Sequence, residues 1–127
     1  MTPGQWEPKV WGSVSHLFTA DHVAVSHLRV NAGYRCSQHY HAKRVNMFVV
    51  VSGKVLIEVT NDSVQCQHTL TAGETLVVNP MRLHCFHVLE SGSMVEVYWT
   101  NDGSPVRLDD IHRLDEGGVS VYAEDFK

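Results

Sequence analysis

The chain has 127 residues, 43% of them hydrophobic, and a formal net charge of −4 at pH 7. This length predicts a single domain over residues 1–127, and the mild negative charge without a Lys/Arg block argues against nucleic acid or an anionic membrane as a partner. No apolar run approaches the length of a membrane span, and the first residues lack a secretory pattern, so a cytoplasmic location is expected. The three cysteines lack the spacing of a disulfide framework or a zinc ribbon, whereas nine histidines are unusually many for this length.

Short β-branched and aromatic runs alternate with turn residues along most of the chain. In chain order the expected strands lie within residues 22–30, 47–53, 54–60, 74–79, 84–89 and 94–100. Strands punctuated this often, with no stretch of helical period between them, predict an all-β sandwich or barrel whose core covers about residues 22–100. The acidic tail, residues 101–127, lacks strand character and is expected to close one end of the barrel as a loop or short helix. The expected core side chains include Phe48, Val50, Leu76, Val78, Phe86 and Val97.

The segment GYRCSQHYHAKRVNMFVVVSG carries a histidine pair, His39 and His41. Residues two apart on a strand face the same way, so both imidazoles would enter one space. Together with Gly33, Asn46 and Gly53, the pair resembles the first motif of the cupin superfamily, G-x5-H-x-H-x4-E-x6-G, with asparagine in place of the glutamate.

A second cupin motif, G-x5-P-x-G-x2-H-x3-N, is matched in part by GETLVVNPMRLHCFHV. Counted from Gly73, His84 falls in register and Pro80 stands one place from the expected proline. The resemblance implies a double-stranded β-helix, also called a jelly-roll barrel, in which His39, His41 and His84 converge on one point.

Further features resemble the C-terminal cupin domain of type II mannose-6-phosphate isomerases. They are Trp11-Gly12, the strand Val49 to Gly53, and Asp109-Asp110-Ile111 with Arg113. Those isomerases usually carry glutamine at the position of His39 and glutamate at the position of Asn46. The resemblance implies a metal-dependent activity on a small sugar or sugar phosphate.

Three neutral imidazoles with open coordination positions suit a divalent metal ion, and Zn, Fe, Ni, Mn and Cu all fit such a set. Asn46 has two interpretations: its amide oxygen ligates the metal, or the amide hydrogen-bonds a metal-bound water. The second is favoured, because a neutral amide competes poorly with water. In either case the site lacks an anionic ligand, so a bound metal would be the stronger Lewis acid.

Two residues are candidates for catalytic proton transfer. Glu96 follows the second motif and His27 lies on an earlier strand, and either could act as a general acid or base if it faces the cavity. A solvent-facing position is the alternative for both. His87 is an odd number of residues from His84, so it is expected to face away from the metal. Three cations expected at the mouth of the site are candidates for binding a phosphate group: Lys43, Arg44 and Arg82.

Three functions are compatible with these residues. The isomerase resemblance favours a metal-dependent isomerase or epimerase of sugars or sugar phosphates. A site of three histidines without a carboxylate also resembles that of the iron-dependent thiol dioxygenases. The third possibility is a non-catalytic cupin that binds a small molecule. Exposed strands need covering in solution, so a homodimer is expected.

Overall fold

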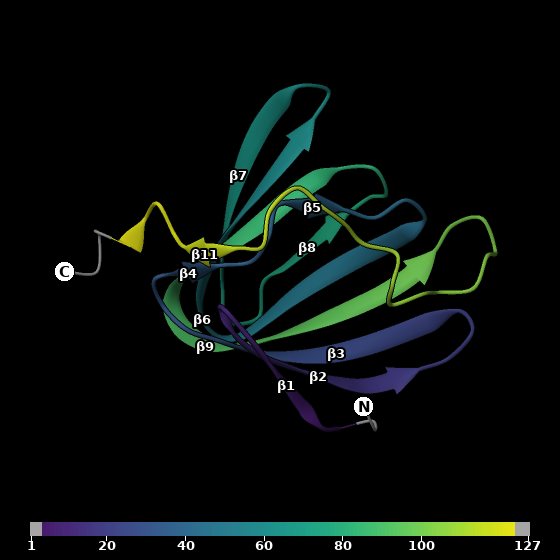
Figure 1. Ribbon diagram of the computed structural model, residues 1–127, viewed down its shortest axis with the longest axis horizontal. Helices are drawn as coiled ribbons and strands as arrows, with labels where there is room; N and C mark the ends of the chain where they lie inside the picture. Colours follow the sequence, from purple (N-terminus) through teal and green to yellow (C-terminus); the bar gives the residue numbers. More distant parts are fainter. Residues whose placement is uncertain (1–3, 124–127) are drawn as a thin grey trace.

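The computed structural model describes residues 4–123, which form strands and loops without an α-helix. The strands are β1 (Trp6–Lys9), β2 (Gly12–Thr19), β3 (Val23–Val30), β4 (Tyr34–Arg35), β5 (His39–Tyr40), β6 (Arg44–Asn61), β7 (Val64–Thr71), β8 (Thr75–Val78), β9 (Leu83–Thr100), β10 (His112–Arg113) and β11 (Gly118–Val119). Neighbouring strands pair antiparallel into one curled sheet (Figure 1). The predicted all-β fold is confirmed. Within the described range, no helix is long and apolar enough to cross a membrane.

Two long strands, β6 and β9, organise the sheet. They pair with each other along most of their length, with register shifts around Ser52. A Cβ added to Gly92 at this point would lie 2.1 Å from the backbone oxygen of Ser52, so the close approach of the strands requires glycine. Beyond the shift β9 pairs with β3, and before it β9 pairs with β4 and β5. Each long strand therefore belongs to both halves of the curled sheet.

The core lies between these two halves. Phe48, Val50, Val78 and Phe86 are buried there as predicted, and Leu76 is half-buried against them; the other buried apolar members are Trp11, Val14, Leu28, Val30, Cys36, Val55, Ile57, Val59, Leu70, Cys85, Val88 and Met94. The prediction for Val97 is wrong, because this side chain is only half-buried. Buried residues on this part of β9 are Met94 and Tyr98, and strand alternation turns Val97 to the other face.

The segment after β9 lies across the body of the sheet. Figure 1 shows it running in yellow beside β4 and β5, where β10 pairs with β5 and β11 pairs with β4. This tail was expected as a loop or short helix, and it instead adds two short strands. It therefore forms one wall of the space that holds the histidine cluster.

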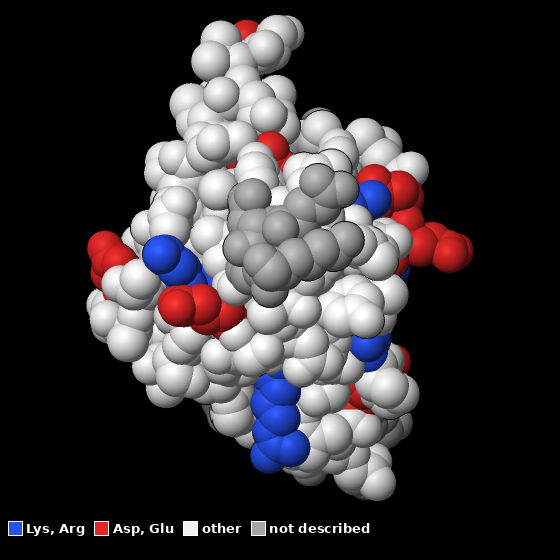
Figure 2. Space-filling model, turned by 90° about the vertical axis from the view of Figure 1, so that its left-hand side faces the viewer, with Lys and Arg blue, Asp and Glu red and all other residues white. Residues whose placement is uncertain are grey.

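Charged residues are dispersed over the surface. Figure 2 shows Lys and Arg interspersed with Asp and Glu on the visible face, without a broad field of one sign. This face offers no continuous basic surface for a polyanion.

Candidate metal centre

The structure brings His39, His41 and His84 together from two distant parts of the chain. His39 on β5 is the direct cross-strand partner of His84 on β9, and His41 follows His39 by two residues. The ring centroids are 4.4 Å apart for His39 and His84, 5.0 Å for His39 and His41, and 5.2 Å for His41 and His84. One nitrogen from each ring lies within 4.8 Å of the other two, and all three residues are buried.

Backbone carbonyl groups fix the tautomer of all three rings. The Nδ1 atom of His39 lies 2.8 Å from the oxygen of Ser37, that of His84 lies 2.9 Å from the oxygen of Arg82, and that of His41 lies 2.5 Å from the oxygen of Asp110. A carbonyl only accepts, so each Nδ1 carries the proton and each Nε2 keeps its lone pair. Such outer hydrogen bonds are typical of metal-binding histidines.

The three histidines stay neutral at physiological pH. Burial lowers the pKa of His39 to about 3, that of His41 to about 2 and that of His84 to about 4, in each case from 6.5. The Nε2 atom of His84 is buried with no hydrogen-bond partner among the described residues. A buried nitrogen lone pair without a donor is costly, and a metal ion would satisfy it. The residues therefore fit a divalent metal ion.

Acid is expected to destabilise the metal-free protein. The folded-state pKa values of these histidines lie below 6.5, so unfolding takes up protons and stability falls as pH drops below about 6.5. Each histidine contributes up to about 1.4 kcal/mol per pH unit. Urea unfolding at pH 7.0 and pH 5.0 measures the loss. A His84→Asn variant serves as the comparison, and an equally steep decline in that variant would contradict this origin.

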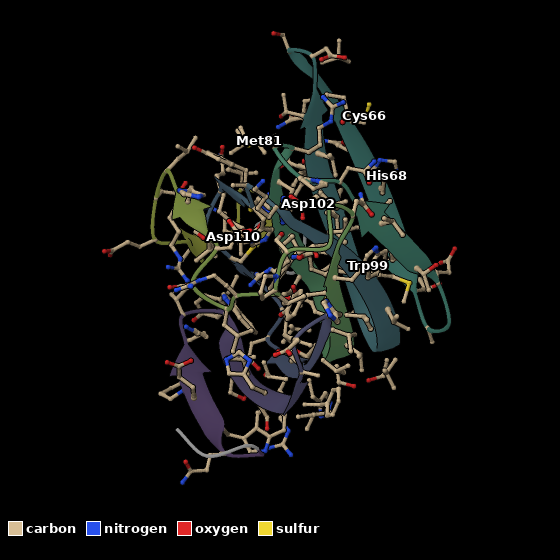
Figure 3. The ribbon with its side chains drawn as sticks, turned by 90° about the vertical axis from the view of Figure 1, so that its right-hand side faces the viewer. Cys66, His68, Met81, Trp99, Asp102 and Asp110 are labelled. Atoms are coloured by element: carbon tan, nitrogen blue, oxygen red, sulfur yellow. The ribbon has the colours of Figure 1, made fainter. Side chains whose placement is uncertain are left out.

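Asp110 ties the tail to the loop that carries His41. Its carboxylate accepts hydrogen bonds from the backbone N–H groups of Ala42, Lys43 and Arg44 at 2.8, 2.9 and 3.0 Å. Burial opposes ionisation here, but these three donors lower the pKa of Asp110 below its usual value. The same residue's carbonyl holds His41, and Figure 3 shows Asp110 on the segment that crosses the molecule. Asp110 therefore orients a candidate ligand without touching the metal position itself.

Replacing Asp110 with alanine is expected to weaken metal binding by roughly 10- to 100-fold, as for other residues that orient a ligand. The free energy of unfolding should also fall by roughly 1–3 kcal/mol, because the half-buried N–H groups of Ala42 and Arg44 and the exposed N–H of Lys43 lose their acceptor. Isothermal titration with Zn²⁺ measures the first effect. Asp109→Ala is the matched control, since the Asp109 carboxylate is exposed and its ion pair among residues 4–123 is with Arg107. Equal losses in both variants would contradict the assignment.

Asn46 lies beside the cluster, and its hydrogen bonds set its orientation. The Nε atom of Arg44 donates to the Asn46 amide oxygen at 3.2 Å, so the amide nitrogen faces inward. That nitrogen lies 3.0 Å from Nε2 of His41 and donates to the carboxylate of Glu96 at 3.1 Å. The oxygen is engaged by Arg44, so Asn46 is not treated as a ligand in the proposal below, and a metal ion bound to Nε2 of His41 would replace the contact with the amide nitrogen.

Glu96 is connected to the cluster through Asn46. Burial raises the pKa of Glu96 to about 7, although the nearby Arg44 charge and a hydrogen bond with Tyr98 lower it. Tyr98 is itself buried under the guanidinium of Arg44, whose central carbon lies 4.2 Å from the ring centroid. At neutral pH the Glu96 carboxyl is therefore poised between its protonated and ionised forms.

A cavity of about 500 Å³ opens beside the cluster. Its walls include both His39 and Glu96, together with Arg44 and Tyr98. This volume is in the usual range for a site that binds a small molecule. A ligand in the cavity would contact His39 and Glu96 at the same time.

Other predicted residues lie away from this cavity. The ring of His27 lies 5.1 Å from the ring of Trp6, and the buried face of β3 is formed by the alternate residues Ala24, Ser26, Leu28 and Val30. The geometry gives His27 no contact with the cluster, so it is not carried into the proposal. Two of the expected phosphate-binding cations form surface ion pairs instead, Lys43 with Asp102 and Arg82 with Asp62, whereas the third, Arg44, is buried in the cavity wall.

Sequence reasoning missed Tyr98 and the role of Asp110. Tyr98 lies two residues beyond Glu96 on β9, so strand alternation could have placed both on the inner face. The Asp110 contact joins positions about seventy residues apart, and no local pattern predicts it.

A curled antiparallel sheet with three buried histidines at its centre defines a metal-binding β-barrel of the jelly-roll type. Residues 26–101 match the family described as the cupin domain, and the chain belongs to this family. No curated protein sequence matches the chain.

Solved structures of oxalate decarboxylase from Bacillus subtilis are similar in fold. The enzyme at pH 4.6 superposes with a TM-score of 0.76 at 13% identity, covering 87% of this chain and 30% of that one. A second structure, described by its Mn(II) centres, gives a TM-score of 0.73 at 11% identity with the same coverage, and a variant gives 0.70 at 15% identity, covering 83% of this chain and 30% of that one. This chain thus spans less than a third of the decarboxylase, and the likeness concerns the fold.

Proposed function

We propose that this cupin is a metal-dependent isomerase or epimerase of a small sugar or sugar phosphate, with Glu96 as the group that moves the proton. The observation that carries the proposal is the shared cavity: His39 on one wall and Glu96 on another face the same space. A divalent metal ion held by the three histidines supplies Lewis-acid polarisation of a substrate carbonyl.

Glu96 is suited to accept a proton and return it. Its pKa of about 7 makes both protonation states accessible at neutral pH, which favours general acid–base catalysis. The hydrogen bond from Asn46 at 3.1 Å fixes the carboxylate, and Tyr98 supports it from the other side. Abstraction of a proton from the carbon next to a carbonyl, followed by its return to a neighbouring carbon, is the step these residues favour.

The buried guanidinium of Arg44 supports an anionic substrate. Arg44 forms hydrogen bonds with Asn46, His41 and two backbone carbonyls, and it forms no ion pair within residues 4–123. The Glu96 carboxyl in the same cavity has a pKa of about 7 and gives this cation only a partial counter-charge at neutral pH, so a bound phosphate or carboxylate group would be favoured beside it. The cavity is also lined by Lys9, which pairs with Glu7 at 3.4 Å.

The test is proton exchange. Metal-loaded protein is incubated with mannose 6-phosphate and related aldose phosphates in D₂O, and incorporation of deuterium next to the carbonyl is followed by NMR. Exchange with the phosphates, weaker exchange with the free sugars, and none after chelation are expected. An absence of exchange with every metal among Zn, Fe, Ni, Mn and Cu would overturn the proposal.

A second candidate function rests on the ligand set itself. The cluster offers three neutral nitrogens, and within residues 4–123 no Asp or Glu belongs to the group. This set also suits iron in a dioxygenase of small thiols. Oxygen uptake by the iron-loaded protein with a thiol substrate would support the dioxygenase function, and full activity without iron would exclude it.

We also propose a homodimer. Several apolar side chains on strands remain exposed: Leu17, Phe18, Val51, Val64 and Val77. Strand β7 pairs only with β6, and β8 pairs only with β6, so their outer edges are open within the described sheet. Light scattering at micromolar concentration should give the mass of two chains, and a monomer would refute this proposal.

A further inference from the structure

Two buried cysteines lie against each other outside the histidine cluster. Cys36 directly follows β4, and Cys85 lies on β9. The backbone N–H of Phe86 donates to the sulfur of Cys36 at 3.1 Å, and the thiol of Cys85 donates to the carbonyl of Cys36 at 3.3 Å. The thiols also act on each other: burial and the Cys85 thiol raise the pKa of Cys36, whereas the Cys36 thiol lowers the pKa of Cys85. Each sulfur is thus in hydrogen-bond contact with the backbone of the segment that carries the other cysteine.

The backbone geometry permits a covalent bond between them. Arg35 pairs with His87 across β4 and β9, and Cys36 donates its N–H to the carbonyl of Phe86 at 3.1 Å. Cys36 therefore lies opposite Phe86, and Cys85 is its diagonal neighbour on a strand about 4.8 Å away. With a rise of about 3.3 Å per residue this diagonal gives a Cα separation of roughly 6 Å, inside the range of about 4.4–6.8 Å over which disulfides form.

We propose that Cys36 and Cys85 are a site of reversible disulfide formation by a hydroperoxide. The peroxide oxidises one thiol to a sulfenic acid and leaves as water or an alcohol. The sulfur of the second thiol then attacks that sulfur, the S–S bond forms, and the hydroxyl group leaves as water with the second thiol's proton. Two thiols lose two hydrogens and two electrons, and the peroxide O–O bond is reduced. Cys36 lines the cavity, which gives a small peroxide a route to the pair.

Both cysteines adjoin the supports of the metal centre. Cys36 precedes Ser37, whose carbonyl holds the Nδ1 proton of His39 at 2.8 Å, and Cys85 directly follows His84. Within residues 4–123 the three histidines are the only group of His, Cys, Asp and Glu residues with the spacing of a metal site, so the thiol pair is separate from the ligands. Closing the disulfide would shift the two backbone segments that position His39 and His84. Oxidation is therefore expected to lower metal affinity.

Peptide mapping tests the bond itself. The full chain is reduced, freed of reductant, treated with hydrogen peroxide, blocked with iodoacetamide and digested with trypsin. Cleavage at Lys and Arg places Cys36 in peptide 36–43, Cys66 in 55–82 and Cys85 in 83–107. A linked species of 36–43 with 83–107, lost on adding dithiothreitol, is expected. Linkage through Cys66, linkage between two chains, or oxidised single cysteines without the linked species would overturn the proposal.

Matched variants and a second measurement complete the test. Figure 3 shows Cys66 on the β6–β7 hairpin, and β6 lies between this residue and Cys85 on β9. Cys66→Ser should therefore keep the linked species, whereas Cys85→Ala and Cys36→Ala should each abolish it. Zn²⁺ affinity, measured against a chelator, should fall about 10-fold on oxidation and return on reduction, like the loss of a ligand support. Unchanged affinity in a linked protein would overturn the coupling to the metal centre. Neither measurement depends on the isomerase activity.

Discussion

Replacing His84 with alanine is expected to lower the affinity for a divalent metal ion by on the order of 100-fold or more, since losing an outer support alone costs 10- to 100-fold. His84 is the ligand with the clearest open lone pair, because its Nε2 has no partner among the described residues while its Nδ1 is fixed by Arg82. Titration with Zn²⁺ and Mn²⁺, monitored by calorimetry, gives the measurement.

The control is His22→Ala. His22 is exposed in the loop before β3, and its loss should leave affinity unchanged. Circular dichroism should show the same strand content in both variants. If the His84 variant binds metal as tightly as the wild type, the three-histidine centre is refuted, independently of any activity.

Replacing Glu96 with glutamine is expected to reduce turnover by roughly 10²- to 10⁴-fold while metal affinity changes little. The amide keeps the shape of the carboxyl and still accepts the hydrogen bond of Asn46, but it cannot take up and return a proton. Steady-state rates with the substrate identified by proton exchange, together with Zn²⁺ titration, separate the two effects. Unaltered turnover in a metal-loaded variant would exclude Glu96 as the acid or base.

The same variant has a stability effect that needs no substrate. The folded-state pKa of Glu96, about 7, lies above its usual 4.5, so the folded protein favours the protonated carboxyl. The contribution of this one group to stability therefore falls as pH rises from about 4.5 to 7, opposite in sign to that of the histidines. Glutamine cannot ionise. The variant should therefore be more stable than the wild type at pH 8, by roughly 1–3 kcal/mol. Urea unfolding at pH 8 measures this difference, and a less stable variant would contradict the buried environment.

The histidine cluster was predictable because its geometry follows from simple rules. Strand alternation places His39 and His41 on one face, and the spacing of the two motifs brings His84 into register with them. The same alternation, applied to β9, would have shown that Glu96 and Val97 face opposite sides. An inward Glu96 and a buried Val97 cannot both hold on one regular strand. In the structure Glu96 lines the cavity and Val97 is half-buried on the opposite face.

Other parts of the site depend on contacts that no local pattern encodes. Arg44 was expected at the solvent-exposed mouth because charged side chains rarely enter a core. Its guanidinium is buried because it packs over the ring of Tyr98 and donates hydrogen bonds to the amide oxygen of Asn46 and to two backbone carbonyls of the tail. Partners this far apart in sequence are set by how the tail docks, and periodicity carries no information about docking.

The contact of Asp110 with the His41 loop also bears on how the protein is made. All three candidate ligands leave the ribosome well before Asp110 does, yet His41 is held in its ligating tautomer by the carbonyl of that later residue. A nascent chain that ends before Asp110 contains the three imidazoles but lacks the carbonyl that fixes the tautomer of His41. Until Asp110 has docked, the tautomer of His41 that suits metal binding is therefore not fixed by this carbonyl.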